Sequence, residues 1–286
     1  MEARMIDLTP EQSQHWRQHY SEHAKYWEKW ADPMAEQQEK INQMLLDAAG
    51  VSEGMSVLDL ASGAGEPAMT AARRVGSHGS VTVTDVAPEM VEAARRRSEK
   101  LGLGNISFET AAMERLPFSD DSFDAITCRY GLMYCDDPAA AWRECARVLK
   151  GGRRAAHMVW GPEENNTMVW TVMRAANNSW DNPISDEEVG HPLRFAANHS
   201  LLPFVMAAGL VHGKEQDIEV QPRIKVGVPF WQPLIEINAG AIWSGLAQDA
   251  RQRTKEAVIA ALEPFRDGEF YRFKTHMRIA VGTKAD

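Results

Sequence analysis

The chain has 286 residues, of which 44% are hydrophobic and 25% are charged, which is typical of a globular protein that can bury a full core. Its formal net charge is -9 at pH 7 and it has no block of lysine or arginine, which argues against a nucleic-acid partner. The three cysteines lack metal-ligand or secretory spacing, the N-terminus has no apolar leader, and no apolar run reaches the roughly 20 residues of a membrane span. We therefore expect a cytoplasmic protein without a membrane span.

Residues 10–49 are predicted to form two helices, with a break at Ala31 and Asp32 before Pro33. Aromatic residues recur on the first helix at close to the helical period, at Trp16, Tyr20, Trp27 and Trp30. His15, His19 and His23 also recur every four residues. Two histidines at this spacing can bind a metal, but no acidic or cysteine partner is identifiable, so we interpret them as a solvated helix face and predict no metal site.

Strands and helices alternate between residues 55 and 160. The predicted strands are Val57–Leu60, Val81–Thr84, Asn105–Thr110, Phe123–Cys128 and Ala155–Trp160. The predicted helices are Pro67–Val75, Pro88–Leu101 and Pro138–Leu149, the last of which is expected to end at Gly151 and Gly152. This alternation predicts an α/β fold with a parallel sheet covered by helices on both faces.

The alternation stops after Trp160. The remaining segments are predicted as a helix at Asn165–Trp180, a loop at Asn182–Pro192, a helix at Leu201–Gly209, a strand at Ile218–Val228, a helical stretch at Phe230–Leu262 broken near Ser244 and Gly245, and a final strand at Tyr271–Val281. We divide the chain into an N-terminal helical cap (1–50), a cofactor-binding core (51–160), a helical lid or substrate region with one strand (161–265) and a final strand (266–286).

The segment Val57–Gly65 is an apolar strand that ends in a carboxylate and turns through two glycines into a helix. Gly63, Gly65 and Ala68 satisfy the pattern G-x-G-x-x-A, and Asp85 lies at the distance of a ribose-binding acid, so a nicotinamide dinucleotide would also fit. Asp59 favours another ligand, because a carboxylate beside this turn repels a phosphate and attracts a cation. S-adenosylmethionine has an α-ammonium group, a sulfonium and no phosphate.

With these features the chain resembles the class I S-adenosylmethionine-dependent methyltransferases, in particular the small-molecule group similar to the quinone-biosynthesis enzymes. The motifs that carry the resemblance are Val57–Gly65, Asp85, the segment 112–118 followed by Ser122, Phe123 and Asp124, and the segment 147–152. The resemblance implies a Rossmann-like, doubly wound, mostly parallel sheet of seven strands, the last one antiparallel, with N-terminal helices and a helical lid insertion. It also implies S-adenosylmethionine as the cofactor and S-adenosylhomocysteine as the product.

The same resemblance implies which residues contact the cofactor. Asp59 would lie near the methionine ammonium, Asp85 would take the ribose hydroxyls, Met90 would pack beside the ribose and adenine, and the backbone near Arg129 and Tyr130 would accept from the ammonium. The full set of expected cofactor-binding residues is Asp59, Ala61, Ser62, Gly63, Gly65, Asp85, Val86, Met90, Ala112, Met113, Glu114, Arg129 and Tyr130. The family usually has an acidic residue where Ala112 stands, so the bond to the adenine amino group is either lost here or supplied by water or Glu114.

The expected reaction is methyl transfer to a small hydrophobic or aromatic acceptor by direct in-line displacement. A general base would add about 10²–10⁴-fold if the acceptor is a phenol or an activated carbon. The candidate catalytic residues are His191, Tyr130 and Tyr134. The tryptophans of the N-terminal and C-terminal segments either line the acceptor pocket or attach the added helices to the core. The alternative functions are an NAD-dependent oxidoreductase and a non-catalytic S-adenosylmethionine-binding module. A homodimer is one assembly that the sequence leaves open.

Overall fold

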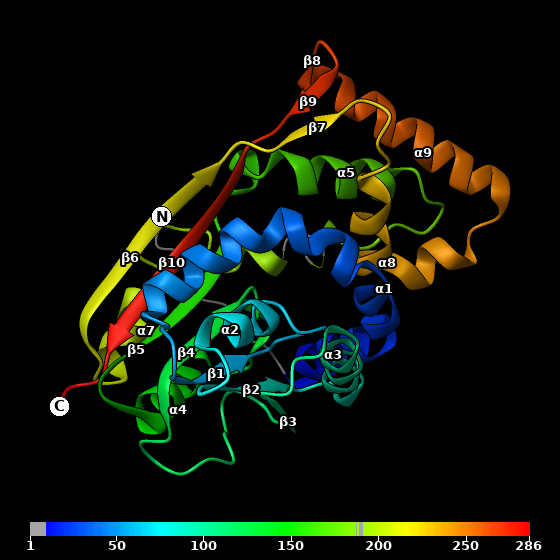
Figure 1. The fold of residues 1–286 in the computed structure, drawn as a ribbon. Helices are drawn as coiled ribbons and strands as arrows, with labels where there is room; N and C mark the ends of the chain where they lie inside the picture. The colour runs from blue at the N-terminus through cyan, green and yellow to red at the C-terminus, as the bar shows by residue number, and fades with distance from the viewer. Residues whose placement is uncertain (1–9, 187, 189–190) are drawn as a thin grey trace.

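A computed structural model describes residues 10–186, 188 and 191–286 (Figure 1). Its centre is a seven-stranded sheet in the order β3-β2-β1-β4-β5-β10-β6. The strands are β1 (Ser56–Leu60), β2 (Ser80–Asp85), β3 (Ile106–Thr110), β4 (Phe123–Arg129), β5 (Leu149–Trp160), β6 (Val211–Val220) and β10 (Thr275–Thr283). The first five are parallel, and β10 pairs antiparallel with both β5 and β6. The predicted fold class, with seven strands and an antiparallel last one, is confirmed.

Helices cover both faces of this sheet. On one face lie α2 (Ala68–Val75), α3 (Pro88–Leu101) and the C-terminal part of α1 (Pro10–Ala49), whose apolar side chains share one hydrophobic cluster with the sheet. The other face is covered by α4 (Pro138–Val148) and α7 (Leu202–Ala207), which share a second cluster with it. Both faces are buried, which explains why the central strands are almost continuously apolar.

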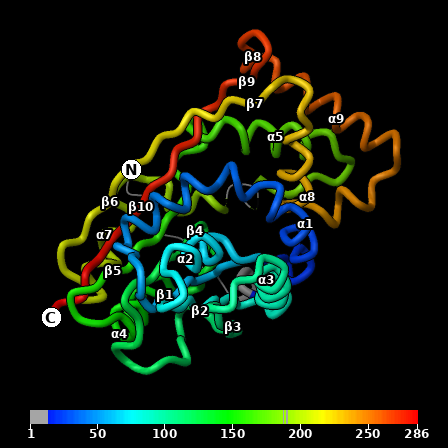
Figure 2. Tube along the Cα trace, viewed as in Figure 1, coloured from blue at the N-terminus to red at the C-terminus, as the bar shows by residue number. Residues whose placement is uncertain are grey.

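A third hydrophobic cluster lies outside the sheet. It joins α5 (Thr167–Asn178), α8 (Trp231–Gly245) and α9 (Gln248–Leu262) to a small sheet of β7 (Arg223–Lys225), β8 (Arg266–Asp267) and β9 (Phe270–Arg272). In Figures 1 and 2 these elements gather at one end of the molecule, away from β1, β2 and β3. Short 3-10 turns complete the chain at η1 (Leu132–Tyr134), η2 (Glu163–Asn165), η3 (His191–Leu193) and η4 (Glu263–Phe265).

Several predicted elements differ from the structure. The two N-terminal helices are one helix, α1, which contains Pro33 and changes direction along its length (Figure 1). Gly151 and Gly152 do not end a helix, because α4 stops at Val148 and β5 runs through both glycines. The strand predicted at Ile218–Val228 is divided between β6 and β7, and the predicted final strand is divided between β9 and β10.

Two expectations about the whole chain can be compared with the described residues. None of the helices in this part of the chain is both long and apolar enough to cross a membrane. The three cysteines, Cys128, Cys135 and Cys145, are free and buried, as expected of small core residues.

Candidate functional site

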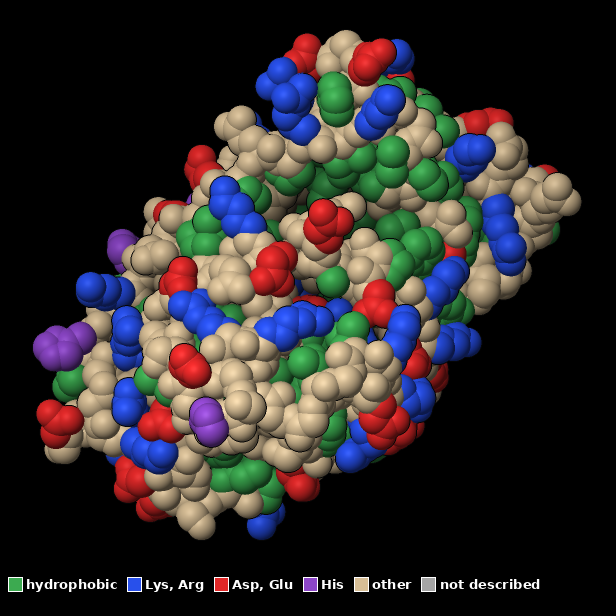
Figure 3. All heavy atoms as spheres, viewed as in Figure 1, with side chains coloured by type: hydrophobic (Ala, Val, Ile, Leu, Met, Phe, Trp, Pro, Cys, Tyr) green, Lys and Arg blue, Asp and Glu red, His purple; other side chains and the backbone are tan. Residues whose placement is uncertain are grey.

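A cavity of about 940 Å³ lies at the carboxyl edge of the central sheet. Its wall contains residues that directly follow β1, β2, β3 and β4, which is where open α/β sheets bind ligands. Residues of α1, α5, α8 and β7 close the opposite side. In Figure 3 hydrophobic side chains surround a hollow in the region where Figure 1 shows α5 and β7. A space of this size accommodates a cofactor and a small acceptor together.

Most of the predicted site residues meet in the wall of this cavity. Those present are Ala61, Ser62, Gly63, Asp85, Val86, Met90, Ala112, Met113, Glu114, Arg129, Tyr130 and Tyr134. Asp59, Gly65 and His191 are not among the lining residues. The sheet topology brings these distant segments together, because β1, β2, β3 and β4 are neighbours and all of them end at the same edge.

Asp59 is fully buried beneath the wall. Its carboxylate accepts hydrogen bonds from the Ser62 hydroxyl at 2.7 Å and from the Thr127 hydroxyl at 2.7 Å. Burial raises the pKa of Asp59 to about 6, although these two hydroxyls favour the ionised form. Asp59 therefore orients Ser62, which does line the cavity, and its predicted contact with an ammonium group stays a prediction.

Asp85 holds the glycine turn in place. Its two carboxylate oxygens accept from the backbone N–H groups of Gly63 and Ala87, each at 3.0 Å. Burial raises the pKa of Asp85, and these backbone donors oppose the rise. Gly63 has φ of +53°, a conformation that glycine adopts without steric cost. Asp85 thus fixes the backbone of the motif, and its predicted contact with the ribose stays a prediction.

The loop after β4 lies against the loop after β1, and a glycine makes this possible. A Cβ on Gly131 would overlap the Cβ of Ala61 and would lie 3.0 Å from the sulfur of Cys128. Ala61 itself has φ of +49°, so the chain is already constrained at this contact. Because Ala61 and Gly131 both line the cavity, the contact determines the shape of the wall.

A polar network that was not predicted from the sequence ties α1 to this wall. Arg129 donates to Asn42 Oδ1 at 2.7 Å and to Gln38 at 2.8 Å. The amide of Asn42 donates to Glu66 at 2.6 Å, and Glu66 accepts from Arg97 at 2.6 Å. Glu66 lies inside the glycine motif, where its charge was a signal that could have indicated the network, whereas Asn42 is one of several polar residues at its end of α1 and carried no such signal.

The tryptophans divide into two groups. Trp16, Trp27, Trp30, Trp160 and Trp170 line the cavity, as expected for an apolar acceptor pocket. The others pack in the hydrophobic cores, namely Trp142 in the sheet core and Trp180, Trp231 and Trp243 in the core formed by α5, α8 and α9. Some of the tryptophans thus attach the added helices to the core, as one interpretation expected, while others line the cavity, and the binding of an acceptor beside them stays a prediction.

The three candidate catalytic residues have different environments. Tyr130 stacks on Trp160 with ring centroids 4.1 Å apart, and burial raises its pKa. Burial raises the pKa of Tyr134 to about 12. His191 donates from Nε2 to the Met133 carbonyl at 3.0 Å and stacks on Trp16, while burial lowers its pKa to about 4. At neutral pH both phenols keep their protons, and the imidazole is neutral.

The helical histidines do not form a solvated face, which corrects the interpretation made from the sequence. His23 is only 4% exposed, and its Nδ1 lies 2.7 Å from the His19 carbonyl. His19 lines the cavity, and its ring stacks on that of His23 at 4.0 Å. His15 is exposed, and its Nε2 lies 3.1 Å from Glu188 Oε1, an acidic partner that the sequence did not reveal.

With this geometry described, the chain can be compared with known proteins. Residues 57–152, which contain the glycine turn, Asp85 and Arg129, match the family described as a methyltransferase domain. This segment of the chain is similar to methyltransferase domains. The segment includes β1 to β4 and α4, and it ends within β5.

The chain is also similar to a curated relative and, in fold, to two solved structures. Over 110 residues the chain is 40% identical to the ubiquinone/menaquinone biosynthesis C-methyltransferase UbiE of Idiomarina loihiensis, a match that covers 38% of this chain and 44% of the relative. The match thus spans less than half the length of that relative. The YcgJ protein of Bacillus subtilis is 25% identical, with a TM-score of 0.51, over 86% of this chain and 98% of that one.

The second solved structure is phosphoethanolamine N-methyltransferase 2 of Haemonchus contortus in complex with S-adenosyl-L-methionine. It has a TM-score of 0.55 at 16% identity, over 86% of this chain and 53% of that one. At this identity the likeness concerns the fold. It extends beyond the methyltransferase domain and includes most of the chain.

Proposed function

We propose that this chain catalyses S-adenosylmethionine-dependent methyl transfer to a small hydrophobic or aromatic acceptor by direct in-line displacement. One observation carries the proposal: the glycine turn of the methyltransferase domain and Asp85 form one wall of a large cavity whose opposite side is apolar. The methyltransferase relative supports the same reaction class over the matched region.

The residues of the wall fit S-adenosylmethionine. Asp85 would accept from the ribose hydroxyls, Met90 and Met113 would pack against the ribose and adenine, and the backbone at Gly63 would lie beside the methionine portion. A Cβ at Gly63 would meet open space, so the backbone there is accessible to a ligand. When bound, the cofactor supplies a methyl group activated by the sulfonium.

A dinucleotide fits this wall less well. Three buried carboxylates, Asp59, Glu66 and Asp85, surround the turn that would have to receive the pyrophosphate. Glu66 is matched by Arg97, but Asp59 and Asp85 are held by hydroxyl or backbone donors. Their negative charge would oppose a phosphate in a poorly solvated site.

The acceptor would lie on the apolar side of the cavity. This side is formed by Trp27, Trp30 and Met34 of α1, by Met173 of α5 and by Ile224 of β7. Such a wall binds an acceptor by burying its apolar area, at about 25 cal/mol per Å². Holding the acceptor in line accounts for up to roughly 7–11 kcal/mol of the barrier.

General-base catalysis is a smaller part of this proposal. Tyr130 and Tyr134 line the cavity, but their raised pKa values keep both phenols protonated at neutral pH. His191 lies outside the lining residues, with its Nε2 proton engaged by the Met133 carbonyl. We therefore assign the main contribution to positioning, and the three candidate catalytic residues remain predictions.

The test is to incubate the full chain with methyl-labelled S-adenosylmethionine and a metabolite extract and to identify labelled products by mass spectrometry. We expect a labelled small molecule of low polarity, which is absent with the Asp85→Ala variant. If the wild-type chain binds S-adenosylhomocysteine but labels nothing, it is a non-catalytic binding module. A labelled polar acceptor would contradict the assignment of the apolar wall.

A further inference from the structure

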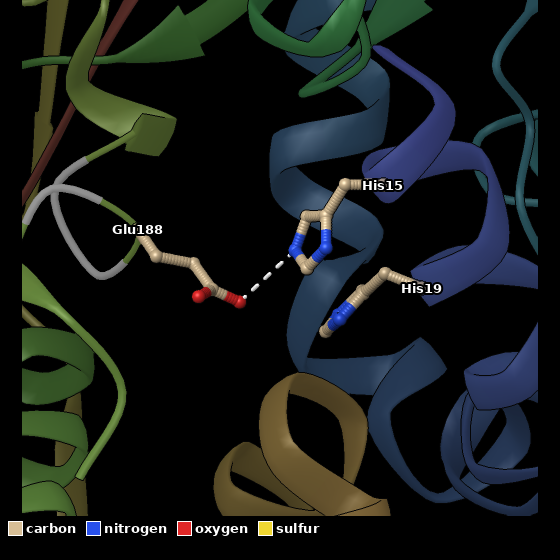
Figure 4. Close-up of side chains that lie close together, drawn as sticks. All are labelled: His15, His19 and Glu188. Atoms are coloured by element: carbon tan, nitrogen blue, oxygen red, sulfur yellow. Dashed lines mark hydrogen bonds and ion pairs between the residues drawn. The ribbon is translucent and has the colours of Figure 1, made fainter. Parts of the chain in front are cut away.

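Three side chains with metal-binding atoms converge at the edge of the cavity. His15 and His19 come from α1, and Glu188 comes from the segment that follows α5 (Figure 4). One imidazole nitrogen from each histidine and one carboxylate oxygen all lie within 4.8 Å of one another. The His15 Nε2 and Glu188 Oε1 atoms are already only 3.1 Å apart.

This spacing is close to that of a coordination shell. Histidines four residues apart lie on the same side of a helix and are a workable ligand pair. Ligand atoms about 2.0–2.1 Å from a tetrahedral zinc ion lie roughly 3.3 Å from one another. The three ligand atoms would therefore have to approach one another by at most about 1.5 Å, a change on the scale of a side-chain rotation.

The ligand atoms are available for an ion. Within the described part of the chain, the His19 ring has no hydrogen-bond partner, although it packs against His23. The Glu188 carboxylate has His15 as its side-chain partner. The nearest cation on the same helix turn, Arg17, is paired with Asp136 at 3.1 Å, which reduces its repulsion of an ion.

We propose that His15, His19 and Glu188 bind one divalent transition-metal ion of the zinc class, with an open coordination position directed into the cavity. Two imidazoles and one carboxylate are the ligand set of zinc sites that keep a position for substrate or water. His19 and Glu188 both line the cavity, so that position is accessible from inside.

The ion would hold an oxygen of the acceptor, a role that rests on the proposed function. Two neutral imidazoles and one carboxylate leave one positive charge on a divalent ion, which favours a phenolate, enolate or carboxylate oxygen. A bound cation also lowers the pKa of a coordinated hydroxyl group. The site would thus activate the acceptor without a general base.

The test uses Co²⁺ as a probe, because it occupies zinc-type sites and absorbs visible light when protein ligands bind it. The full chain, freed of metal with a chelator, is titrated with Co²⁺ and followed by absorption and by calorimetry. We expect one ion per chain. Loss of a ligand in Glu188→Gln or His19→Ala should weaken binding at least ~100-fold, beyond the roughly 10–100-fold typical of changes to groups that only orient a ligand.

The matched control is His78→Ala, which removes an exposed histidine far along the chain. Its affinity for Co²⁺ should equal that of the wild type. The proposal would be overturned if the wild type bound Co²⁺ no more tightly than Glu188→Gln. It would also be overturned if Glu188→Gln, His19→Ala and the control His78→Ala all lost the same affinity for Co²⁺. Glu188→Gln preserves the size of the side chain, so a loss of Co²⁺ in a variant with an unchanged melting temperature reports the ligand itself.

Calorimetry with S-adenosylhomocysteine on the same proteins separates this proposal from the proposed function. We expect its affinity to be the same in the wild type, Glu188→Gln and His78→Ala. Binding of S-adenosylhomocysteine without Co²⁺ would overturn only the metal site. Binding of Co²⁺ without S-adenosylhomocysteine would overturn the proposed function, and with it the role of the ion in holding the acceptor, but not the metal site itself.

Discussion

Asp59 is a buried carboxylate that positions a residue of the cavity wall, Ser62. Its carboxylate lies beneath the wall, with hydroxyl groups from Ser62 and Thr127 as partners. Two hydrogen bonds do not fully replace water around an ionised carboxylate, which is why burial raises its pKa to about 6. Keeping this charge ionised at neutral pH therefore lowers the stability of the folded chain.

A prediction for Asp59→Asn follows from the sign of this shift. The folded-state pKa of Asp59, about 6, exceeds the usual 3.8. The favourable contribution of the protonated Asp59 to the free energy of unfolding is therefore complete below pH 3.8 and is lost as the pH rises through 6. The full loss is about 3 kcal/mol. The asparagine side chain of the variant cannot ionise, so its free energy of unfolding should rise relative to the wild type between pH 4 and 7.

Urea denaturation of both proteins at pH 4.5 and pH 7.5 measures this difference. Comparison with the wild type removes the contributions of Asp85 and the other carboxylates, which are common to both proteins. If the difference in free energy of unfolding between Asp59→Asn and the wild type is the same at the two pH values, ionisation of Asp59 does not destabilise the folded chain.

Strands with buried, apolar side chains were the easiest elements to recognise in the sequence. The strands β1, β2 and β4 and the second half of β5 are mostly buried, and their predicted cores match the structure. The strand β3 is more exposed, but it was also predicted because it continues the alternation of strands and helices. The first half of β6, residues 211–217, is mostly exposed and polar, so neither an apolar run nor an alternating pattern marked it. The strands of the small sheet have only two or three residues, which is too short for any periodicity.

The candidate site could be predicted only in part from the sequence. Residues that follow a strand within the motif region were found, because parallel strands end at a common edge. The contacts of Arg129 with Gln38 and Asn42 join residues about 90 positions apart, and no local pattern predicts such pairs. The same limit hid Glu188, which lies 173 positions from His15.

The contact between the loops after β1 and β4 can be tested by a substitution at Gly131. In Gly131→Ala the new methyl group would overlap Ala61, so one of the two loops must move. Overpacking of this kind costs about 1–3 kcal/mol. We also expect weaker binding of S-adenosylhomocysteine, because both loops line the cavity.

The matched control is Gly104→Ala, where a Cβ would meet nothing within 4 Å. Its free energy of unfolding should stay within about 0.5 kcal/mol of the wild-type value. If Gly131→Ala folds and binds as Gly104→Ala does, the close approach of the loops does not shape the site.

For the molecule as a whole, the two ends of the cavity have different chemistry. The segment 57–152 supplies backbone turns and buried carboxylates, whereas α1 and the elements after β5 supply most of the aromatic and aliphatic side chains of the lining, together with several polar ones. We propose that the first end selects the methyl donor and the second selects the acceptor. Assembly as a homodimer stays a prediction, which the molar mass in solution would test.

The central claim is that the wall built on Asp85 binds S-adenosylmethionine, and titration calorimetry with S-adenosylhomocysteine and with NADH tests it directly. We predict one S-adenosylhomocysteine per chain and no NADH. Asp85→Asn, which removes a charged acceptor worth about 1.5–3 kcal/mol, should weaken binding roughly 10- to 100-fold. Binding of NADH in place of S-adenosylhomocysteine, or an unchanged affinity in Asp85→Asn, would contradict the account.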